Sequence, residues 1–230
     1  EAGALVGFYW LSRHKFEAGR FDFSLFVPAE RRGQGIGRRL YAEMTAIPAV
    51  AQATKLRTSV RDDRPADRAF AERRGFQMLR HHFMMGLDLD AFDDRPYDAI
   101  IARLEGEGFQ FTSMAALGNT EEAQRKLYAL NDSTSASTPG SEGEHSWESF
   151  EDFQKSVCQS DWYKPDGQMV VIDTGSGEWA AMSAITRLEG NDYAYNLFTG
   201  VDGRYRGRKL GQAVKVTALR FARGTLGAHQ

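Results

Sequence analysis

Two stretches of the chain repeat one pattern of residues, and this repeat limits the possible folds more than any other feature of the sequence. The first is SLFVPAERRGQGIGRRL at residues 24–40, and the second is LFTGVDGRYRGRKLGQAV at residues 197–214. In each, a strand-like run ends in a valine, an Arg-Gly pair begins five residues later, and a glycine-containing turn opens an amphipathic helix. Because more than 170 residues separate the copies, they indicate two related domains rather than a solenoid of short repeats.

Composition and charge exclude several classes of protein. The 230 residues carry 29 basic and 31 acidic side chains, a formal net charge of −2, and 42% of them are hydrophobic. This balance is typical of a soluble globular protein. We expect no nucleic-acid partner and no membrane partner, because there is no basic excess and no run of about 18 apolar residues. The single Cys158 excludes an internal disulfide, and no Cys/His cluster has metal-ligand spacing, so we expect a cytoplasmic protein without a metal.

Hydrophobic periodicity predicts an α/β chain of strands and helices. The expected strands are residues 4–11, 17–27, 55–60, 76–89, 109–114, 168–173, 179–187 and 192–201. The expected helices are residues 31–46 (closed by Pro48), 65–74, 96–106, 121–131 and 148–158, and a last one within residues 205–223. On the strand expected at 76–89, His81 and His82 would lie on opposite faces, which excludes a paired ligand set.

An acidic stretch that ends in proline, residues 88–96, predicts the domain junction. We therefore expect a first domain at residues 1–92 and a second at residues 93–230. The polar segment 132–145 is expected to be a loop within the second domain.

The turn in the first copy has the features of an anion site. Gly33, Gly35 and Gly37 allow positive φ angles and leave room for a ligand, so backbone N–H groups of the turn and the first helical turn can converge on an anion. Arg32 and Arg38 flank this turn and could bond to phosphate oxygens. The alternative is a glycine-rich turn without a ligand. Two common phosphate loops are excluded, because Arg38 replaces the third glycine of the dinucleotide fingerprint and no Gly-Lys-Ser/Thr tripeptide occurs.

The pattern Arg32-Gly33-Gln34-Gly35-Ile36-Gly37, preceded by Leu25-Phe26-Val27, resembles the acetyl-CoA motif of the Gcn5-related N-acetyltransferase (GNAT) superfamily. Residues 55–76, which end in Arg74-Gly75-Phe76, look like the second cofactor motif of that family. The whole chain is similar to its bacterial tandem members, a group that includes mycothiol synthase.

This resemblance implies two tandem acyl-CoA N-acyltransferase domains, each with a mixed, mostly antiparallel, splayed sheet flanked by helices. It also implies that both copies are incomplete at the chain ends. Residues 1–92 would be the C-terminal portion of the first domain, with an intact loop, and residues 93–230 the N-terminal portion of the second, with a degenerate loop.

The resemblance also implies which residues bind acetyl-CoA. In the first copy these are Leu25, Phe26, Val27, Arg32, Gly33, Gln34, Gly35, Ile36, Gly37 and Arg38, and in the second copy Thr199, Val201, Arg206, Gly207, Arg208 and Gly211. Lys209 replaces the first motif glycine of the second copy. If that position needs a left-handed backbone, the lysine costs about 1–2 kcal/mol; if it is already helical, the ammonium could meet a phosphate.

Proton transfer is expected at two positions of the family pattern. Members often use a glutamate six positions before the motif valine and a tyrosine four positions before the glycine of the Gly-Phe pair. The first copy has Phe21 and Ala71 there, and neither can move a proton. The second copy has Tyr195 at the first position, which makes it the candidate catalytic residue; the alternative is an ordinary half-buried strand aromatic.

Three aromatic residues, Trp147, Trp162 and Tyr163, lie where this family lines the acceptor side, so they could shape a substrate pocket or pack in the core. The expected function is transfer of an acetyl group from acetyl-CoA to a primary amine, on a small molecule or a peptide, by direct attack. The alternatives are a catalytically silent acyl-CoA-binding or sensing protein, and a scaffold with two vestigial loops. We expect a monomer or a homodimer.

Overall fold

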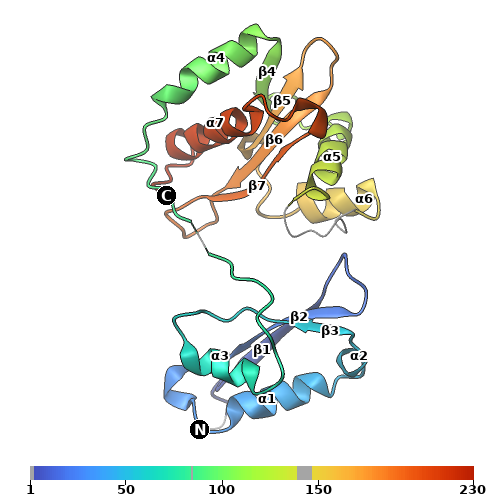
Figure 1. Cartoon of the computed structure of the whole chain (residues 1–230), viewed down its shortest axis with the longest axis vertical. Coiled ribbons are helices and arrows are strands. Elements are labelled where there is room, and N and C mark those ends of the chain that lie inside the picture. The colour runs from blue at the N-terminus through green and yellow to red at the C-terminus, as the bar shows by residue number, and fades with distance from the viewer. Residues whose placement is uncertain (1–2, 84, 139–146) are drawn as a thin grey trace. The chain divides into compact units, whose positions relative to one another are not determined.

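A computed structural model describes residues 3–83, 85–138 and 147–230 of the chain. The chain forms two compact units, residues 1–83 and 84–230, each with its own sheet (Figure 1). The segment just before residue 93, which the sequence placed in the first domain, packs in the second unit. Leu89 is 2% exposed and lies in a cluster with Ile185 and Ala218, and its N–H donates to the His229 carbonyl over 2.8 Å.

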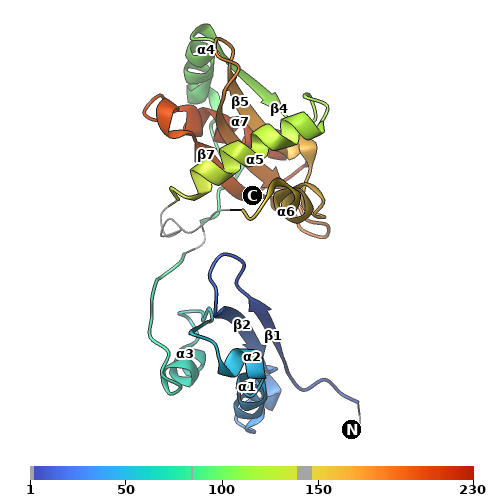
Figure 2. The same cartoon turned by 90° about the vertical axis from the view of Figure 1, so that its right-hand side faces the viewer.

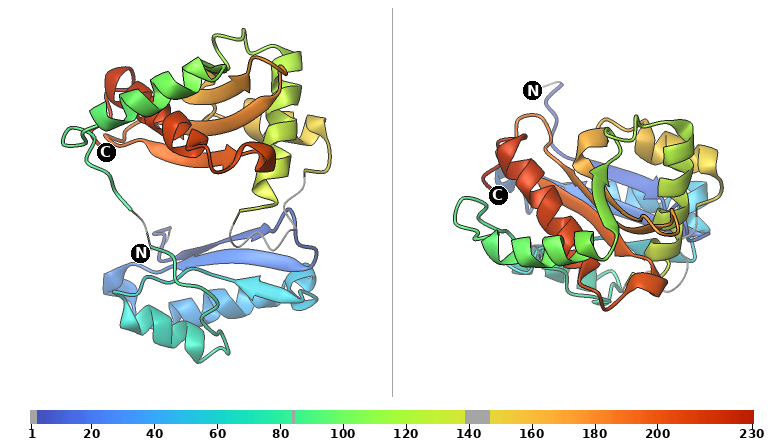
Figure 3. Two further views of the ribbon diagram at one scale, coloured as in Figure 1. Left: turned by 45° about the horizontal axis from the view of Figure 1, so that its top comes forward. Right: turned by 90° about the horizontal axis from the view of Figure 1, so that it is seen from above.

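The first unit is a three-stranded sheet with helices on one side of it (Figure 3). Strands β1 (Phe8–Arg13), β2 (Arg20–Phe26) and β3 (Lys55–Arg57) lie in that order, with β1 antiparallel and β3 parallel to β2. The helices are α1 (Ile36–Thr45), α2 (Pro48–Ala51) and α3 (Pro65–Glu72). The period-two pattern of β2 buries Phe21 and Phe23, which are 7% and 5% exposed. The Phe23 ring lies 6.1 Å from Tyr41 of α1 and 5.7 Å from Phe76, so this face of the sheet carries the core.

The second unit is a four-stranded antiparallel sheet covered on both faces (Figure 2). Strands β4 (Phe109–Ser113), β5 (Gln168–Asp173), β6 (Trp179–Thr186) and β7 (Tyr195–Val201) follow one another across the sheet. Helices α5 (Glu121–Ser135) and α6 (Phe150–Phe153) cover one face, and α4 (Asp98–Gly106) and α7 (Leu210–Gly224) cover the other. All eight residues of β6 are buried, because this strand lies between the two helical layers.

Most expected elements are found, and the expected class of fold is confirmed: α/β units with mostly antiparallel strands. The strand expected at 76–89 is wrong, because the described residues of this segment have no regular structure. Met78 and Phe83 are 77% and 75% exposed, and no strand of the described chain pairs with them. The opposite-face argument for His81 and His82 therefore does not apply, and His81 Nε2 lies 3.2 Å from the Asp62 carboxylate instead.

Three boundaries also differ from expectation. The first helix begins at Ile36 rather than residue 31, because Gly33 and Gly35 have positive φ angles. Pro48 opens the short α2 instead of only closing α1. Helix α5 continues to Ser135, into the segment expected as a loop, where the Thr134 hydroxyl donates to the Leu130 carbonyl over 2.6 Å. Residues 139–146 of that segment lie outside the described residues.

The two repeated stretches have the same backbone conformation. Each strand is followed by one 3₁₀ turn, Ala29–Arg31 in the first unit and Gly203–Tyr205 in the second, and then by an extended arginine. The residue before each helix is left-handed: φ is 82° at Gly35 and 70° at Lys209. From the sequence, the expected cost of Lys209 depended on whether its backbone is left-handed. The φ angle of 70° shows that it is, so the cost of about 1–2 kcal/mol applies.

The segment before α4 is tied to α7 by an ion-pair cluster. Arg220 and Arg223 of α7 both bond to the Asp94 carboxylate, and Arg220 also bonds to Asp98. Asp94 is 15% exposed. The hydrogen bonds that it accepts lower its pKa to about 2, and the bond from Arg220 contributes more than the bond from Arg223. These contacts join the first and last parts of the second unit.

We expect Asp94→Asn to lower the free energy of unfolding at pH 7 by about 1–3 kcal/mol, because it removes charge-assisted bonds to two arginines. Since the folded pKa is lowered from 3.8 to about 2, this stabilisation is present above pH 4 and is lost as the pH falls from about 4 to 2. Urea unfolding at pH 7 and pH 3 measures both effects. Asp93→Asn is the control, because Asp93 is half exposed in its pair with Arg95 and should matter less. Equal effects of the two substitutions at pH 7 would contradict the prediction.

We expect Lys209→Gly to stabilise the second unit by about 1 kcal/mol, because glycine adopts a left-handed backbone without the steric cost of a Cβ atom. Urea unfolding followed by tryptophan fluorescence measures the change. Lys209→Ala keeps the Cβ atom and removes the charge, so it should give no gain. A gain from alanine as large as that from glycine would show that charge crowding, rather than backbone strain, is the cost.

Candidate functional site

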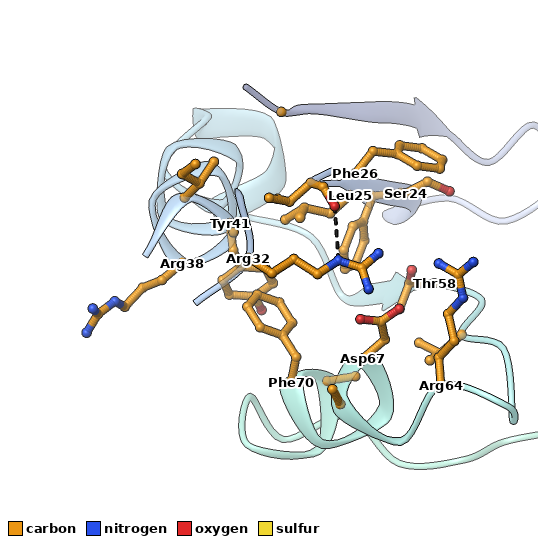
Figure 4. A pocket seen from close by; sticks show the side chains of 18 of the residues that line it. Ser24, Leu25, Phe26, Arg32, Arg38, Tyr41, Thr58, Arg64, Asp67 and Phe70 are labelled. Carbon is orange, nitrogen blue, oxygen red and sulfur yellow. Dashed lines mark hydrogen bonds between the residues drawn. The ribbon is translucent and has the colours of Figure 1, made fainter. Parts of the chain in front are cut away.

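The first unit contains a cavity of about 860 Å³ where β2 and β3 separate. Its walls are the end of β2, the loop and first turn of α1, the residues after β3, and α3 (Figure 4). Nine of the ten first-copy residues expected from the sequence line it: Leu25, Phe26, Val27, Arg32, Gly33, Gly35, Ile36, Gly37 and Arg38. Gln34 does not line it; its side-chain amide donates to the Glu30 carbonyl over 3.4 Å.

The cavity exists because the parallel strands separate. Pairing between β2 and β3 runs from Arg20–Lys55 to Asp22–Arg57, and β2 then continues for four residues, to Phe26. Thr58, Ser59 and Val60 form the facing wall. In the described residues the β3-facing edge of Phe23–Phe26 has no partner strand. An extended ligand with amide groups could therefore bond to this edge as an added strand would.

The loop at one end of this edge presents backbone donors. In the described structure, the first intrahelical bond of α1 runs from Arg39 N to the Gly35 carbonyl, so the N–H groups of Ile36, Gly37 and Arg38 make no bond within the helix. Arg32 Nε donates to the Val27 carbonyl over 3.1 Å and so ties the loop to the end of β2. A Cβ atom on Gly37 would lie 3.4 Å from the Phe70 ring, so a glycine lets α1 and α3 pack closely. Together these features make an anion site of the kind found at helix N-termini.

The cavity is strongly cationic. The described residues that line it include seven arginines (Arg31, Arg32, Arg38, Arg61, Arg64, Arg73 and Arg74) and one carboxylate, Asp67. In Figure 4, Arg32 and Arg64 point toward Thr58 and Asp67, whereas Arg38 points away from them. The Arg38 guanidinium instead lies beside the loop, 3.6 Å from the position of a Cβ atom on Gly35.

Several cavity residues were not identified from the sequence. These are Tyr41 of α1, Thr58 after β3, and Arg64, Asp67, Phe70, Arg73 and Arg74 on or beside α3. The only available signal was the second motif at residues 55–76, for which no individual site residues were assigned. Phe21 is buried and Ala71 lines the cavity, so the two expected proton-transfer positions of this copy hold side chains that cannot transfer a proton.

The loop of the second unit borders a more open cavity of about 580 Å³. Of the expected second-copy residues, Gly207 and Arg208 line it, together with Lys209 and residues of and just after α4. Thr199, Val201, Arg206 and Gly211 do not. Arg206 donates to the Val201 carbonyl over 3.4 Å, as its first-copy equivalent does, and to the Ser137 hydroxyl over 2.6 Å. Arg103 of α4 donates to the Arg208 carbonyl over 3.1 Å.

The remaining second-copy residues lie on and beside β7. The Thr199 hydroxyl bonds to Ser183 over 3.0 Å and to the Asn196 side chain over 3.1 Å. A Cβ atom on Gly211 would lie 3.1 Å from Val201 Cγ2, so the glycine lets α7 approach the end of β7 closely.

Tyr195 is half-buried at the start of β7, and its hydroxyl lies 2.7 Å from that of Tyr193. Two causes raise the pKa of Tyr195: the larger is the hydrogen bond to Tyr193, and the smaller is desolvation. The phenol is therefore protonated at neutral pH, which suits a proton donor better than a base. Six residues of strand, about 20 Å, separate it from the valine that precedes the loop, so only a long extended ligand could reach both.

The aromatic residues expected near the acceptor side take part in packing. Tyr163 is 7% exposed and donates to the Asn119 side chain over 2.8 Å, and Trp147 Nε1 donates to the Asn131 side chain over 2.8 Å. Trp162 packs against the same core cluster. Cys158 also packs there, and burial raises the pKa of its thiol to about 11, as expected for an inert cysteine.

Two features are absent from the described residues: a membrane-spanning helix and a metal-binding cluster. Every helix there is too short or too polar to cross a bilayer. No group of three or more His, Cys, Asp or Glu side chains in those residues is arranged to hold a metal ion.

Comparison with known proteins gives a family for the first unit and a fold for the whole chain. Residues 1–78 match the family model described as an acetyltransferase (GNAT) domain. The comparison with curated proteins gave no match.

Three solved structures share the fold. A tandem GNAT protein from the clavulanic acid biosynthesis pathway is 20% identical with a TM-score of 0.65, covering 100% of this chain and 70% of that one. A GCN5-related N-acetyltransferase from Sphaerobacter thermophilus is 14% identical with a TM-score of 0.63, covering 95% and 65%. The glucosamine N-acetyltransferase region of a fungal multi-domain GH3 β-N-acetylglucosaminidase is 16% identical with a TM-score of 0.62, covering 91% and 26%.

The chain spans less than two thirds of the length of the last two of these proteins. The narrower resemblance to mycothiol-synthase-like members stays a prediction. Residues 1–78 therefore match a GNAT acetyltransferase domain, and over its whole length the chain has the fold of a tandem GNAT protein.

Proposed function

We propose that the protein is an N-acetyltransferase that binds acetyl-CoA in the cavity of the first unit. The observation that carries this proposal is the coincidence of three features in one cavity: an unpaired strand edge, a helix start whose first N–H groups make no intrahelical bond, and a lining of arginines. The loop suits a pyrophosphate, and the edge of β2 suits the amides of a pantetheine arm. The thioester would supply the acetyl group, and a primary amine would attack it directly to give an amide and free CoA.

The acceptor is proposed to be a small-molecule or peptide amine, without a metal, a nucleic acid or a membrane as partner. The single, half-buried Cys158 fits a reducing cytoplasm, and a monomer or homodimer is proposed. The tandem arrangement leaves two candidate units for the chemistry. Tyr195 is proposed as the proton-transferring residue of the second unit, with Thr199, Val201, Arg206, Gly207, Arg208 and Gly211 as a second acyl-CoA site.

We expect acetyl-CoA to bind at one site per chain, and Gly35→Glu to abolish that binding. The substitution places a side chain and a negative charge where the pyrophosphate would lie. Isothermal titration calorimetry measures the affinity. Gly190→Glu is the matched control, because its φ of 82° equals that of Gly35 and it lies in the second unit, away from the residues that line the cavity. Binding that survives Gly35→Glu but is lost in Lys209→Glu would move the site to the second loop, and no binding in the unmodified chain would refute the proposal.

A second function, a catalytically silent acyl-CoA sensor, is favoured by Phe21 and Ala71, which leave the first unit without the two expected proton-transfer side chains. Thiol release distinguishes the two functions, since only an enzyme liberates CoA when a primary amine is added. We expect release with members of a panel of sugar, amino-acid and peptide amines. Saturable binding without release for every amine tested would favour the sensor.

If the second unit performs the chemistry, Tyr195→Phe should lower kcat by about 10²-fold or more. Tyr193→Phe is the control, because it removes the neighbouring hydroxyl and leaves Tyr195 in place, and its kcat should stay within a few-fold. Unchanged turnover in Tyr195→Phe would leave this residue as a strand aromatic and assign the chemistry to other groups.

A further inference from the structure

The cavity of the first unit contains one carboxylate among the described residues that line it, that of Asp67 on α3. The other lining side chains that titrate are arginines, which do not lose their proton in proteins, and Tyr41. The Tyr41 ring is packed among other rings, with centroid distances of 6.1 Å to Phe23 and 6.4 Å to Phe70. Asp67 is therefore the group of this lining best suited to accept a proton from a ligand.

The Asp67 carboxylate is half-buried and available. In the described part of the chain it accepts no hydrogen bond and forms no ion pair, although Arg32 and Arg64 point toward it in Figure 4. The other carboxylate of α3, that of Glu72, is exposed, pairs with Arg68 at 2.7 Å and does not line the cavity. The helix thus carries one carboxylate that is paired at the surface and one that is free to meet a ligand.

Asp67 lies at the end of the cavity where the two parallel strands separate. The pairing of β3 with β2 ends at Arg57, and Thr58 follows directly. Figure 4 shows the Asp67 side chain directed toward Thr58. The loop that suits a pyrophosphate lies at the opposite end of the free edge of β2, about 13 Å away, the length of four residues of strand. A CoA thioester anchored at the loop and extended along this edge presents its acyl end near Asp67.

Residue 67 is also the place that a tyrosine at position 71 would reach. Ala71 occupies the expected tyrosine position and lines the cavity one helical turn after Asp67, about 6 Å along α3. Long side chains on a helix point back toward its N-terminus and cover the preceding turn. A tyrosine at position 71 would therefore extend over residue 67. This chain has a carboxylate there, and the alanine leaves the space around it open.

We propose that Asp67 is the proton-transferring residue of the first unit. The proposal rests on the proposed function, because it assumes acetyl-CoA in the cavity. The nitrogen of the neutral amine attacks the thioester carbonyl carbon, so that a C–N bond forms and the C–S bond breaks. The proton lost by the nitrogen passes to the Asp67 carboxylate and from there to the departing thiolate. The products are an amide and the CoA thiol, and Asp67 returns to its starting state.

The test is the release of CoA thiol from acetyl-CoA by the full chain, with glucosamine, lysine and diglycine as acceptors. We expect Asp67→Asn to lower kcat by about 10²-fold or more, while the calorimetric affinity for acetyl-CoA stays within a few-fold of that of the unmodified protein. Glu72→Gln is the matched control, because it removes the other carboxylate of α3, outside the cavity, and its kcat should be unchanged. Asp67→Ala gives the same readout if Asp67→Asn does not fold.

Chemical rescue distinguishes proton transfer from a positioning role. Asp67→Ala leaves space for a small carboxylate in a cationic lining, so added formate should restore part of its turnover. Chloride at the same ionic strength should not, because it cannot carry a proton from the amine to the thiolate.

Several results would overturn the proposal: an unchanged kcat in Asp67→Asn, a loss of turnover that occurs only in Tyr41→Phe or Tyr195→Phe, or a loss in Asp67→Ala that formate does not restore. Saturable binding of acetyl-CoA without release for every acceptor would also overturn it and favour the sensor. Failure of acetyl-CoA to bind to the unmodified protein would instead refute the proposed function.

Discussion

The left-handed residue between the end of a strand and the start of a helix is the constraint on which the candidate site depends. It turns the chain so that the N–H groups before and inside the helix face one point, and it lets an arginine reach back to the carbonyl of the preceding valine. The same turn forms with Gly35 in the first unit and with Lys209 in the second, although the lysine pays about 1–2 kcal/mol for it. The bond from Arg206 to Val201 is part of what holds the second turn against that strain, and Arg32 makes the equivalent bond to Val27 in the first unit.

The surroundings of the two loops have diverged more than the loops themselves. In the first unit β2 extends past β3 and leaves an open edge, and the arginines on the cavity side of α1 and α3 keep their charges free. In the second unit Arg206 bonds to Ser137, and Arg103 of α4 bonds to the Arg208 carbonyl. Arg206 and the Arg208 carbonyl of the second loop are thus already bonded within the protein, so this loop is the weaker candidate for binding a pyrophosphate. The first unit, in turn, lacks the expected proton-transfer side chains.

The parts of the fold that depend on local pattern were predictable. The alternation of Phe21, Asp22 and Phe23 determines which face of β2 is buried, and the repeat predicted both strand-to-helix turns. The resemblance to the acetyl-CoA motif named nine residues that line the cavity. The strand expected at 76–89 was wrong, because apolar residues form a strand only where a partner edge is available. The extension of α5 buries Thr134 and Ser135, which are 4% and 7% exposed, and a polar composition does not reveal this tertiary packing. Arg64, Asp67 and Arg74 reach the cavity only because α3 folds back against α1, which no short window of sequence contains.

The net charge of the chain does not reveal the local positive charge around the cavity of the first unit, which matters most for a ligand there. A formal charge of −2 for the chain suggests no preference for anions, yet the charges of the first unit are sorted by position. Arginines on the solvent side of α1 and α3 have a glutamate one helical turn later, whereas those facing the cavity do not. Arg38 and Arg73 are exposed and Arg74 is half-buried, so these arginines act at the mouth of the cavity, where salt screens their field. The arginines around the cavity therefore attract an anionic ligand, although the chain as a whole carries a net charge of −2.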